Sequence, residues 1–231
     1  MALKNSIDSC KTCVSGWKRF RILTKTEFQH LNENRYEASF KPGELMVKQD
    51  FPTSNVLFLS SGFAKVYIEG NNSRNFIVTI AKPGQLILGP GAWVSARNTY
   101  TVSALSPVRA CFISFEVFRK LTRENALFGE AMLEELSLMS LRSNERIVSL
   151  AHKKMAGRLA DALLFFSDEL FGSDEFEMLL SRQELGEMTN MAKECVVRII
   201  KDFEDDGLVS SSSSGIRILD KKRITELSEK G

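Results

Sequence analysis

The feature that most constrains this chain of 231 residues is a change in hydrophobic period near Phe115. Between residues 36 and 115, short apolar or alternating runs recur between turn signals, which is typical of an antiparallel sandwich or barrel. From residue 116 to 151 the chain holds no proline and a single glycine, and its apolar residues follow helical spacing. The sequence therefore predicts a β-domain followed by helices, an α+β fold.

The strand-like region contains six apolar or alternating runs. They lie at residues 56–60, 63–69, 75–80, 85–88, 100–104 and 109–114. Turn signals that contain glycine separate them, at residues 41–43, 61–62, 70–72, 82–84 and 89–91. We therefore expect at least six short strands.

The helical region carries a narrow apolar stripe. Its positions alternate at spacings of four and three: Met132, Leu136, Met139, Ser143, Arg146 and Leu150. This heptad-like spacing favours pairing with another helix, and a symmetric dimer is the simplest arrangement. We predict the dimer seam at Met132, Leu136, Met139 and Leu150. Packing of the same stripe against the chain's own domain is the alternative.

The C-terminal region predicts two short helices joined by a tight turn, between residue 181 and about residue 206. A helix at 152–171 and a short strand at 176–180 precede them. Ser181 and Glu184 form an S-x-x-E capping box, which marks the start of the first short helix. The end of the chain predicts a strand, a serine-rich turn and a second strand. This order is typical of a winged helix-turn-helix.

Three polar side chains of the second helix, Lys193, Glu194 and Arg198, have the chemistry of base readers. Arg198 can form a bidentate pair with guanine, Glu194 can accept from cytosine N4, and Lys193 can contact guanine or phosphate. The N-terminal part of this helix enters the major groove in such motifs, so the residues predict sequence-specific binding to double-stranded DNA. Solvated charges on a two-helix packing unit are the alternative.

Phosphate contacts are predicted at the start of the first helix. Ser181, Arg182 and Gln183 present side chains and backbone N–H groups there, and Lys201 adds a cation on the second helix. Charge gives weaker support, because residues 181–231 hold nine Lys or Arg against ten Asp or Glu. DNA affinity must then depend on the placement of a few cations. A module that acts through a protein partner, with weak or no DNA binding, is the alternative function.

These motifs together resemble the CRP/FNR family of bacterial transcription regulators. The resemblance rests on Ser181 to Glu187, on Lys193, Glu194 and Arg198, on Glu204 to Val209, and in the β-region on Lys41 to Glu44, Gly62 and Lys82 to Gly84. It implies a cyclic-nucleotide-binding-like β-roll at 1–115, a dimerisation helix at 116–151 and a winged helix-turn-helix at 152–231. It also implies a homodimer that binds a palindromic promoter site, with RNA polymerase as a further partner.

Two positions of the helix-turn-helix depart from the family pattern. The turn position that often holds glycine is Asn190, and asparagine tolerates the left-handed conformation moderately well. The usual Ser or Thr cap before the recognition helix is Ala192, which leaves that helix start without a side-chain cap. Glu194 and Arg198 fall on the family's base-reading positions, and Lys193 stands where arginine is frequent.

The effector is a separate question. Cyclic-nucleotide members of the family grip their ligand with a Gly-Glu pair and an Arg-Ser or Arg-Thr pair, but Pro90 stands here at the Glu position and Asn98 at the Arg position. Arg97 is one residue away, and a shift of one residue in a strand turns a side chain to the other face. A buried phosphate would lack its partner charge. We therefore expect no cyclic AMP binding and an unknown small effector.

The charge of the N-terminal part leaves open an anionic ligand other than cyclic AMP. Residues 1–127 hold 17 Lys or Arg against 9 Asp or Glu, which gives this part a net charge of +8. Simple solvation of surface charges is the alternative explanation.

Three cysteines offer a second kind of signal. Cys10 and Cys13 form a lone C-x-x-C, and Cys111 lies at the end of the β-region. The arrangement is similar to the iron–sulfur members of the family, which combine an N-terminal cysteine cluster with one distant cysteine. A [4Fe–4S] cluster needs four ligands, so His30 or a carboxylate would supply the fourth. Zinc binding, thiol redox sensing and no cysteine function are the alternatives.

The remaining sequence excludes several other classes. The longest apolar runs are about five residues, whereas a membrane span needs about 20. The N-terminus has no apolar signal core, so we expect a cytoplasmic protein. No nucleophile, base or phosphate loop accompanies either histidine, so we expect no enzyme. A thiol oxidoreductase that uses Cys10 and Cys13 is disfavoured, because this C-x-x-C does not lie in a βαβ pattern.

Overall fold

A computed structural model describes residues 17–70, 75–212 and 215–231. The chain divides into two compact units. The first runs to Glu69 and resumes over Thr79–Met139, and the second combines Gly70–Val78 with Ser140–Gly231. The predicted α+β class is confirmed, because antiparallel sheets in the N-terminal part precede a helix-turn-helix.

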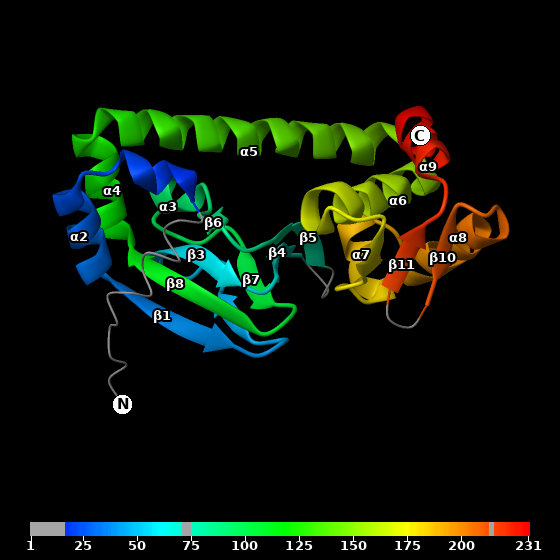
Figure 1. Cartoon of the computed structure of the whole chain (residues 1–231), viewed down its shortest axis with the longest axis horizontal. Coiled ribbons are helices and arrows are strands. Elements are labelled where there is room, and N and C mark those ends of the chain that lie inside the picture. The colour runs from blue at the N-terminus through cyan, green and yellow to red at the C-terminus, as the bar shows by residue number, and fades with distance from the viewer. Residues whose placement is uncertain (1–16, 71–74, 213–214) are drawn as a thin grey trace. The chain divides into compact units, whose positions relative to one another are not determined.

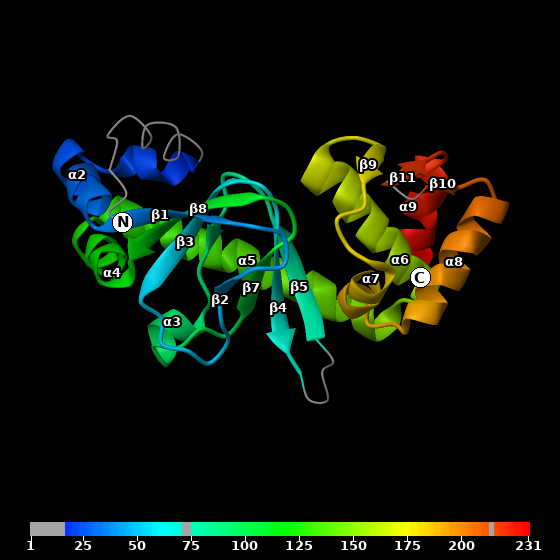
Figure 2. The same ribbon diagram turned by 90° about the horizontal axis from the view of Figure 1, so that it is seen from below.

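The β-roll consists of two four-stranded sheets (Figures 1 and 2). One has the order β1 (Arg35–Phe40), β8 (Val108–Ser114), β3 (Asn55–Ser61) and β6 (Leu86–Ile87). The other has the order β2 (Leu45–Val47), β7 (Thr101–Ala104), β4 (Ala64–Glu69) and β5 (Asn75–Ala81). Each of the six expected runs forms a strand, and β1 and β2 are two further strands outside those runs.

The strand β3 is buried on both of its faces. Val56 and Phe58 belong to a core cluster shared with helices, and Leu57 and Leu59 belong to the cluster inside the roll. Successive side chains of a strand point to opposite faces, so burial of both faces requires an uninterrupted apolar run. This explains why the sequence at 56–59 does not alternate.

Five helical segments contribute to the cluster on the outer face of this sheet. They are η1 (Lys18–Ile22), α2 (Lys25–Glu33), α3 (Gly91–Val94), α4 (Phe115–Glu124) and the first part of α5 (Ala126–His152) (Figure 1). The rings of Phe118 and of Trp17, just before η1, meet Phe128 edge to face, with centroid distances of 5.4 Å and 6.1 Å. The helical signal at η1 and α2 was not recognised in the sequence, although Thr24 and Glu27 form a capping box at the start of α2.

The expected single helix over 116–151 is wrong, because the chain breaks at Asn125. This residue has extended backbone angles, φ −107° and ψ 102°, and separates α4 from α5. Its side-chain oxygen accepts a hydrogen bond from the Phe128 backbone N–H at 3.0 Å. Asparagine therefore acts as the N-terminal cap of α5 and stops α4 at the same point.

The predicted dimer seam is wrong at Met132. Its side chain is 3% exposed and packs in the same core cluster as Phe128. Leu136, Met139 and Leu150 follow Met132 on the same side of α5 and are half-buried. The large apolar side chains that α5 does expose are Leu127, Leu133, Leu138, Leu141, Ile147 and Val148. The stripe at Met132 therefore packs against the chain's own domain.

The second unit contains a winged helix-turn-helix (Figure 2). Its helices are α6 (Met155–Leu164), a π-helix η3 (Phe165–Phe171), α7 (Arg182–Thr189), α8 (Lys193–Asp205) and α9 (Lys221–Lys230). Its strands β9 (Glu175–Glu177), β10 (Val209–Ser211) and β11 (Gly215–Ile218) form one antiparallel sheet with β11 in the centre. The expected wing is confirmed, and α9 was not expected.

The π-helix explains how the predicted helix at 152–171 ends. Phe166, Phe171 and Phe176 are spaced five residues apart, and their rings stack with interplanar angles of 12–16°. A π-helix places residues five apart on one face, so this winding allows Phe166 to meet Phe171. Gly172 then ends the helix in the left-handed conformation, at φ 64°.

The boundary between α5 and α6 lies slightly later than predicted. The helix α5 includes His152, and α6 begins at Met155 after an extended Lys154 with ψ 164°. Asp161 of α6 holds this boundary, because its carboxylate accepts from Lys153 Nζ at 2.7 Å and from the hydroxyls of Ser149 and Ser228. The cluster joins the end of α5 to α6 and α9.

Within the described residues, no helix is both long enough and apolar enough to span a bilayer.

Candidate nucleic-acid interface

The turn between α7 and α8 is built by local contacts that the sequence predicts. The Glu184 backbone N–H donates to Ser181 Oγ at 3.2 Å, and the Ser181 N–H donates to the Glu184 carboxylate at 2.9 Å. This capping box is confirmed. Asn190 adopts the left-handed conformation, with φ 52° and ψ 53°, as expected for the turn position. The Met191 N–H then donates to Gly186 O at 2.9 Å and closes the turn.

The inner faces of α7 and α8 form the core of the motif. The side chains predicted to pack there are all buried: Leu185, Met188, Val196, Ile199 and Ile200. Phe203 extends the row by one helical turn. Ala192 precedes α8 in an extended conformation and provides no side-chain cap, as predicted. Core packing therefore fixes which face of α8 is left for solvent.

The outer face of α8 presents the predicted base readers. Lys193, Glu194 and Arg198 are exposed, and Lys201 follows on the same helix. None of these four side chains forms a hydrogen bond or an ion pair with another residue in the described part of the chain. They provide cationic donors and one carboxylate acceptor on a single helix, a combination that can bond with base edges and phosphates.

Arg182 has an internal partner in addition to its predicted phosphate contact. Its Nη2 donates to Ser211 Oγ in β10 at 2.9 Å, while Glu204 accepts from the Ser211 backbone N–H at 2.9 Å. Burial lowers the pKa of the Arg182 guanidinium, and the nearby Glu204 carboxylate opposes that shift. Arg182 therefore holds the wing against the start of α7. Ser181 and Gln183, the other predicted phosphate contacts on α7, are exposed.

Two arginines that the sequence reading did not assign to this site hold the turn from behind. Arg158 Nη1 donates to Asn190 O at 3.3 Å, and Arg146 donates to Met188 O. Cations near the last carbonyl groups of α7 are favourable, because those groups carry the negative end of the helix dipole. Burial lowers the pKa of Arg146. No local motif marks these contacts, because they join residues at least 32 positions apart.

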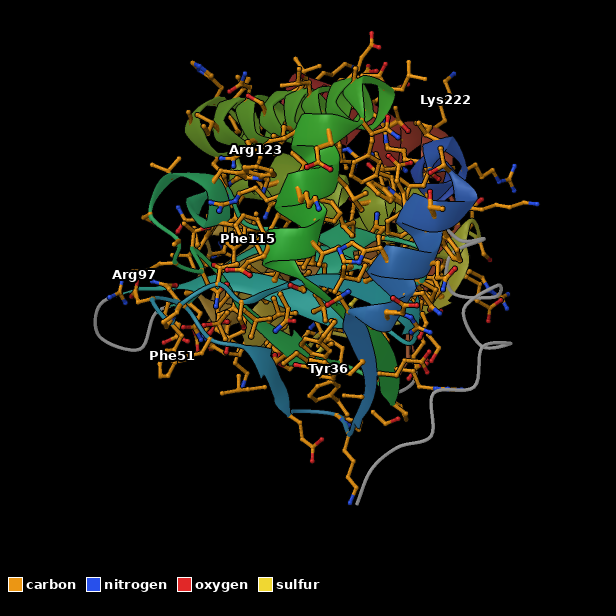
Figure 3. The ribbon with its side chains drawn as sticks, turned by 90° about the vertical axis from the view of Figure 1, so that its left-hand side faces the viewer. Tyr36, Phe51, Arg97, Phe115, Arg123 and Lys222 are labelled. Atoms are coloured by element: carbon orange, nitrogen blue, oxygen red, sulfur yellow. The ribbon has the colours of Figure 1, made fainter. Side chains whose placement is uncertain are left out.

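The residues expected to decide ligand chemistry lie at one corner of the β-roll. Pro90 precedes the short helix α3 (Gly91–Val94). The Asn98 carboxamide accepts from Thr53 Oγ1 at 2.9 Å and donates to Lys48 O at 3.2 Å. Arg97 is exposed and donates to Asp50 O, and Figure 3 shows it beside Phe51 at this corner. Asn98 and Arg97 therefore bond with the loop at 48–53.

The cysteines are only partly described. Cys10 and Cys13 lie outside the described residues. Cys111 is 3% exposed in the core cluster of the first unit, and its sulfur accepts from Arg35 Nη1 at 3.3 Å. His30 is an exposed residue of α2. Over residues 17–70, 75–212 and 215–231, no group of three His, Cys, Asp or Glu side chains is placed to hold a metal ion.

Comparisons with known proteins agree with this architecture. Residues 37–125 match the cyclic nucleotide-binding domain family, and residues 157–227 match the Crp-like helix-turn-helix domain family. Together these matches cover more than two thirds of the chain. The chain belongs to the CRP/FNR family. Members of this family are transcription regulators, which agrees with the expectation that the protein is not an enzyme.

Individual CRP/FNR relatives share low sequence identity over most of the chain. The transcriptional activator protein anr of Pseudomonas aeruginosa is 27% identical over 81% of this chain and 78% of its own length. The nitrogen fixation regulation protein FixK of Bradyrhizobium diazoefficiens is 24% identical over 87% of this chain and 84% of its own length.

A solved structure supports the fold of this CRP/FNR chain. The crystal structure of a crp/fnr family regulator from Eubacterium rectale matches with a TM-score of 0.78 and 18% sequence identity. The match covers 93% of this chain and 99% of that chain. At this identity the likeness shows that the two chains share a fold.

Proposed function

We propose that this CRP/FNR protein is a transcription regulator that binds double-stranded promoter DNA by sequence. The outer face of α8 carries the proposal, because Lys193, Glu194 and Arg198 are exposed there without partners among the described residues. Polar groups without internal partners are free to bond with base edges in a major groove. The capped start of α7 adds backbone N–H groups that suit a phosphate.

The proposed active form is a homodimer that pairs along α5. This helix exposes six large apolar side chains, and a second copy would offer the same surface in return. A parallel pair brings the C-terminal ends of both α5 helices, and the domains that follow them, to one end of the seam. Two recognition helices about 34 Å apart can then enter successive major grooves. The proposal includes a cytoplasmic location and RNA polymerase as a further partner.

Selection from a random double-stranded DNA library tests the proposal. Binding to the selected site and to a scrambled site is then measured by fluorescence anisotropy. Arg198→Ala should weaken binding to the selected site about fivefold to more than a hundredfold, since one good base contact contributes roughly 1–3 kcal/mol of discrimination. Binding to scrambled DNA should change little.

Lys222→Ala is the matched control, because it removes an exposed cation from α9 and should leave both affinities unchanged. An equal loss on both DNAs after Arg198→Ala would show that Arg198 contacts phosphate only. A selection without enrichment would favour the alternative, a module that acts through a protein partner.

The signal at the β-roll is proposed to be a small effector other than cyclic AMP. Pro90 and Asn98 replace the acidic and basic residues of the cyclic-nucleotide members. Asn98 bonds with Thr53 and Lys48, and Arg97 is exposed. Cyclic AMP should therefore give no binding heat in titration calorimetry and no change in affinity for the selected DNA. Saturable heat at one site per chain would contradict this proposal without affecting the one on DNA binding.

Iron–sulfur or zinc binding at Cys10, Cys13 and Cys111 stays a prediction, because Cys10 and Cys13 lie outside the described residues. The Cys111 sulfur is buried in the core of the first unit and accepts a hydrogen bond from Arg35 Nη1 at 3.3 Å.

A further inference from the structure

One face of α5 carries residues at intervals of seven. Leu127, Glu134, Leu141 and Val148 occupy equivalent heptad positions, and Leu138 lies beside them. The four apolar side chains are 48–64% exposed, and the Glu134 side chain is 64% exposed. A single acidic residue therefore interrupts the apolar row between Leu127 and Leu141.

In a symmetric parallel pair, each seam position meets the same position of the second copy. Glu134 then faces the partner's Glu134 within a row of leucine and valine. Two carboxylates at such a place repel each other and lose contact with water when the helices pair. A cation beside Glu134 would remove most of this cost.

Arg19 supplies such a cation from the segment that precedes the β-roll. Its Nη1 lies 2.7 Å from Glu134 Oε2, and its Nε lies 3.1 Å from Glu135 Oε2. The hydrogen bond that Arg19 donates to Glu134 is the largest cause that raises the pKa of the Arg19 guanidinium. Arg19 therefore bridges a residue of the exposed row to its neighbour on the flank of α5.

Core packing of η1 fixes the position of Arg19. Trp17 and Phe20, on either side of it, are 7% and 3% exposed. Their ring centroids lie 6.1 Å and 6.5 Å from that of Phe128, near the start of α5. The cation stays beside Glu134 as long as these two aromatic residues stay packed.

Given the homodimer of the proposed function, we propose that Arg19 sets the strength of the α5 dimer by neutralising Glu134 in its seam. Docking of η1 on α5 then favours the dimer, and release of η1 disfavours it. Loss of the cation should raise the dimer dissociation constant about tenfold, equivalent to about 1.4 kcal/mol. A free energy of this order is expected for two unit charges a few ångströms apart near a protein surface.

Sedimentation equilibrium of the full chain over a range of concentrations measures the dissociation constant. Arg19→Ala should raise it about tenfold at low salt, and the difference should shrink at high salt, where charges are screened. Glu134→Gln should abolish most of the effect of Arg19→Ala in the double variant, because no carboxylate is left to neutralise. Arg21→Ala is the control, since Arg21 is an exposed cation of η1 without an ion pair among the described residues.

Three results would overturn the proposal. An unchanged dissociation constant in Arg19→Ala would show that the ion pair does not act on the seam. An equally weak dimer in the double variant would show that Arg19 acts through folding of η1, and near-UV circular dichroism of the tryptophans would report that unfolding. A wild-type chain that stays monomeric at all concentrations would refute the homodimer itself, and selected-site DNA binding would then be assessed separately.

Discussion

At the scale of single residues, Gly186 shows how closely the helix-turn-helix is packed. A Cβ at this position would lie 2.6 Å from Met191 O. That oxygen belongs to the backbone of the turn, so no side-chain rotation can remove the clash. Glycine at 186 therefore allows the chain to fold back over α7.

Gly186→Ala should destabilise the protein by about 1–3 kcal/mol, the usual cost of forcing extra volume into a packed site. The turn must move, so affinity for the selected DNA should fall as well. Thermal unfolding and fluorescence anisotropy measure the two effects. Ser210→Ala, an exposed change in β10, should alter neither. An unchanged melting temperature in Gly186→Ala would mean that the turn adapts without cost.

Residues of the turn were predictable when their role is local. The capping box joins Ser181 to a residue three positions away, and Asn190 is one of the few residue types that tolerate a positive φ. Arg146 and Arg158 were not predictable in the same way. They bond to carbonyl groups of α7 and the turn from α5 and α6, so only the folded chain brings the partners together.

At the scale of elements, the break between α4 and α5 decides where the long helix starts. Asn125 caps α5 through Phe128 N–H and donates from its amide nitrogen to the Glu27 carboxylate at 3.1 Å. It therefore ties the start of α5 to α2. The sequence does not predict this break, because neither proline nor glycine marks it.

Asn125→Ala should cost about 1–2 kcal/mol of unfolding free energy, because a helix start loses its cap. Urea denaturation followed by circular dichroism measures the loss. Asn144→Ala removes an exposed asparagine from the middle of α5 and should change stability by less than about 0.5 kcal/mol. Equal stability of the two variants would contradict the capping role of Asn125.

At the scale of the whole molecule, α5 carries two apolar stripes, and packing in the first unit determines which of them is buried. The stripe that contains Met132 packs on the core around Phe128, which leaves Leu127, Leu138, Leu141 and Val148 exposed. Spacing alone could not decide this, since both rows repeat at intervals of seven residues. The exposed row is the one that contains Glu134, which is why the proposed effect of Arg19 on the dimer depends on this choice.

The order of the domains, the capped helix-turn-helix and the side-chain chemistry of Lys193, Glu194 and Arg198 follow from the amino-acid sequence alone. These features depend on period, capping and side-chain type, which act over a few residues. The buried face of α5, the start of that helix and the arginines that support the turn follow only from the folded chain. Those outcomes depend on contacts between residues that are far apart in the sequence, such as Trp17 and Phe128. No local sequence pattern predicts such contacts.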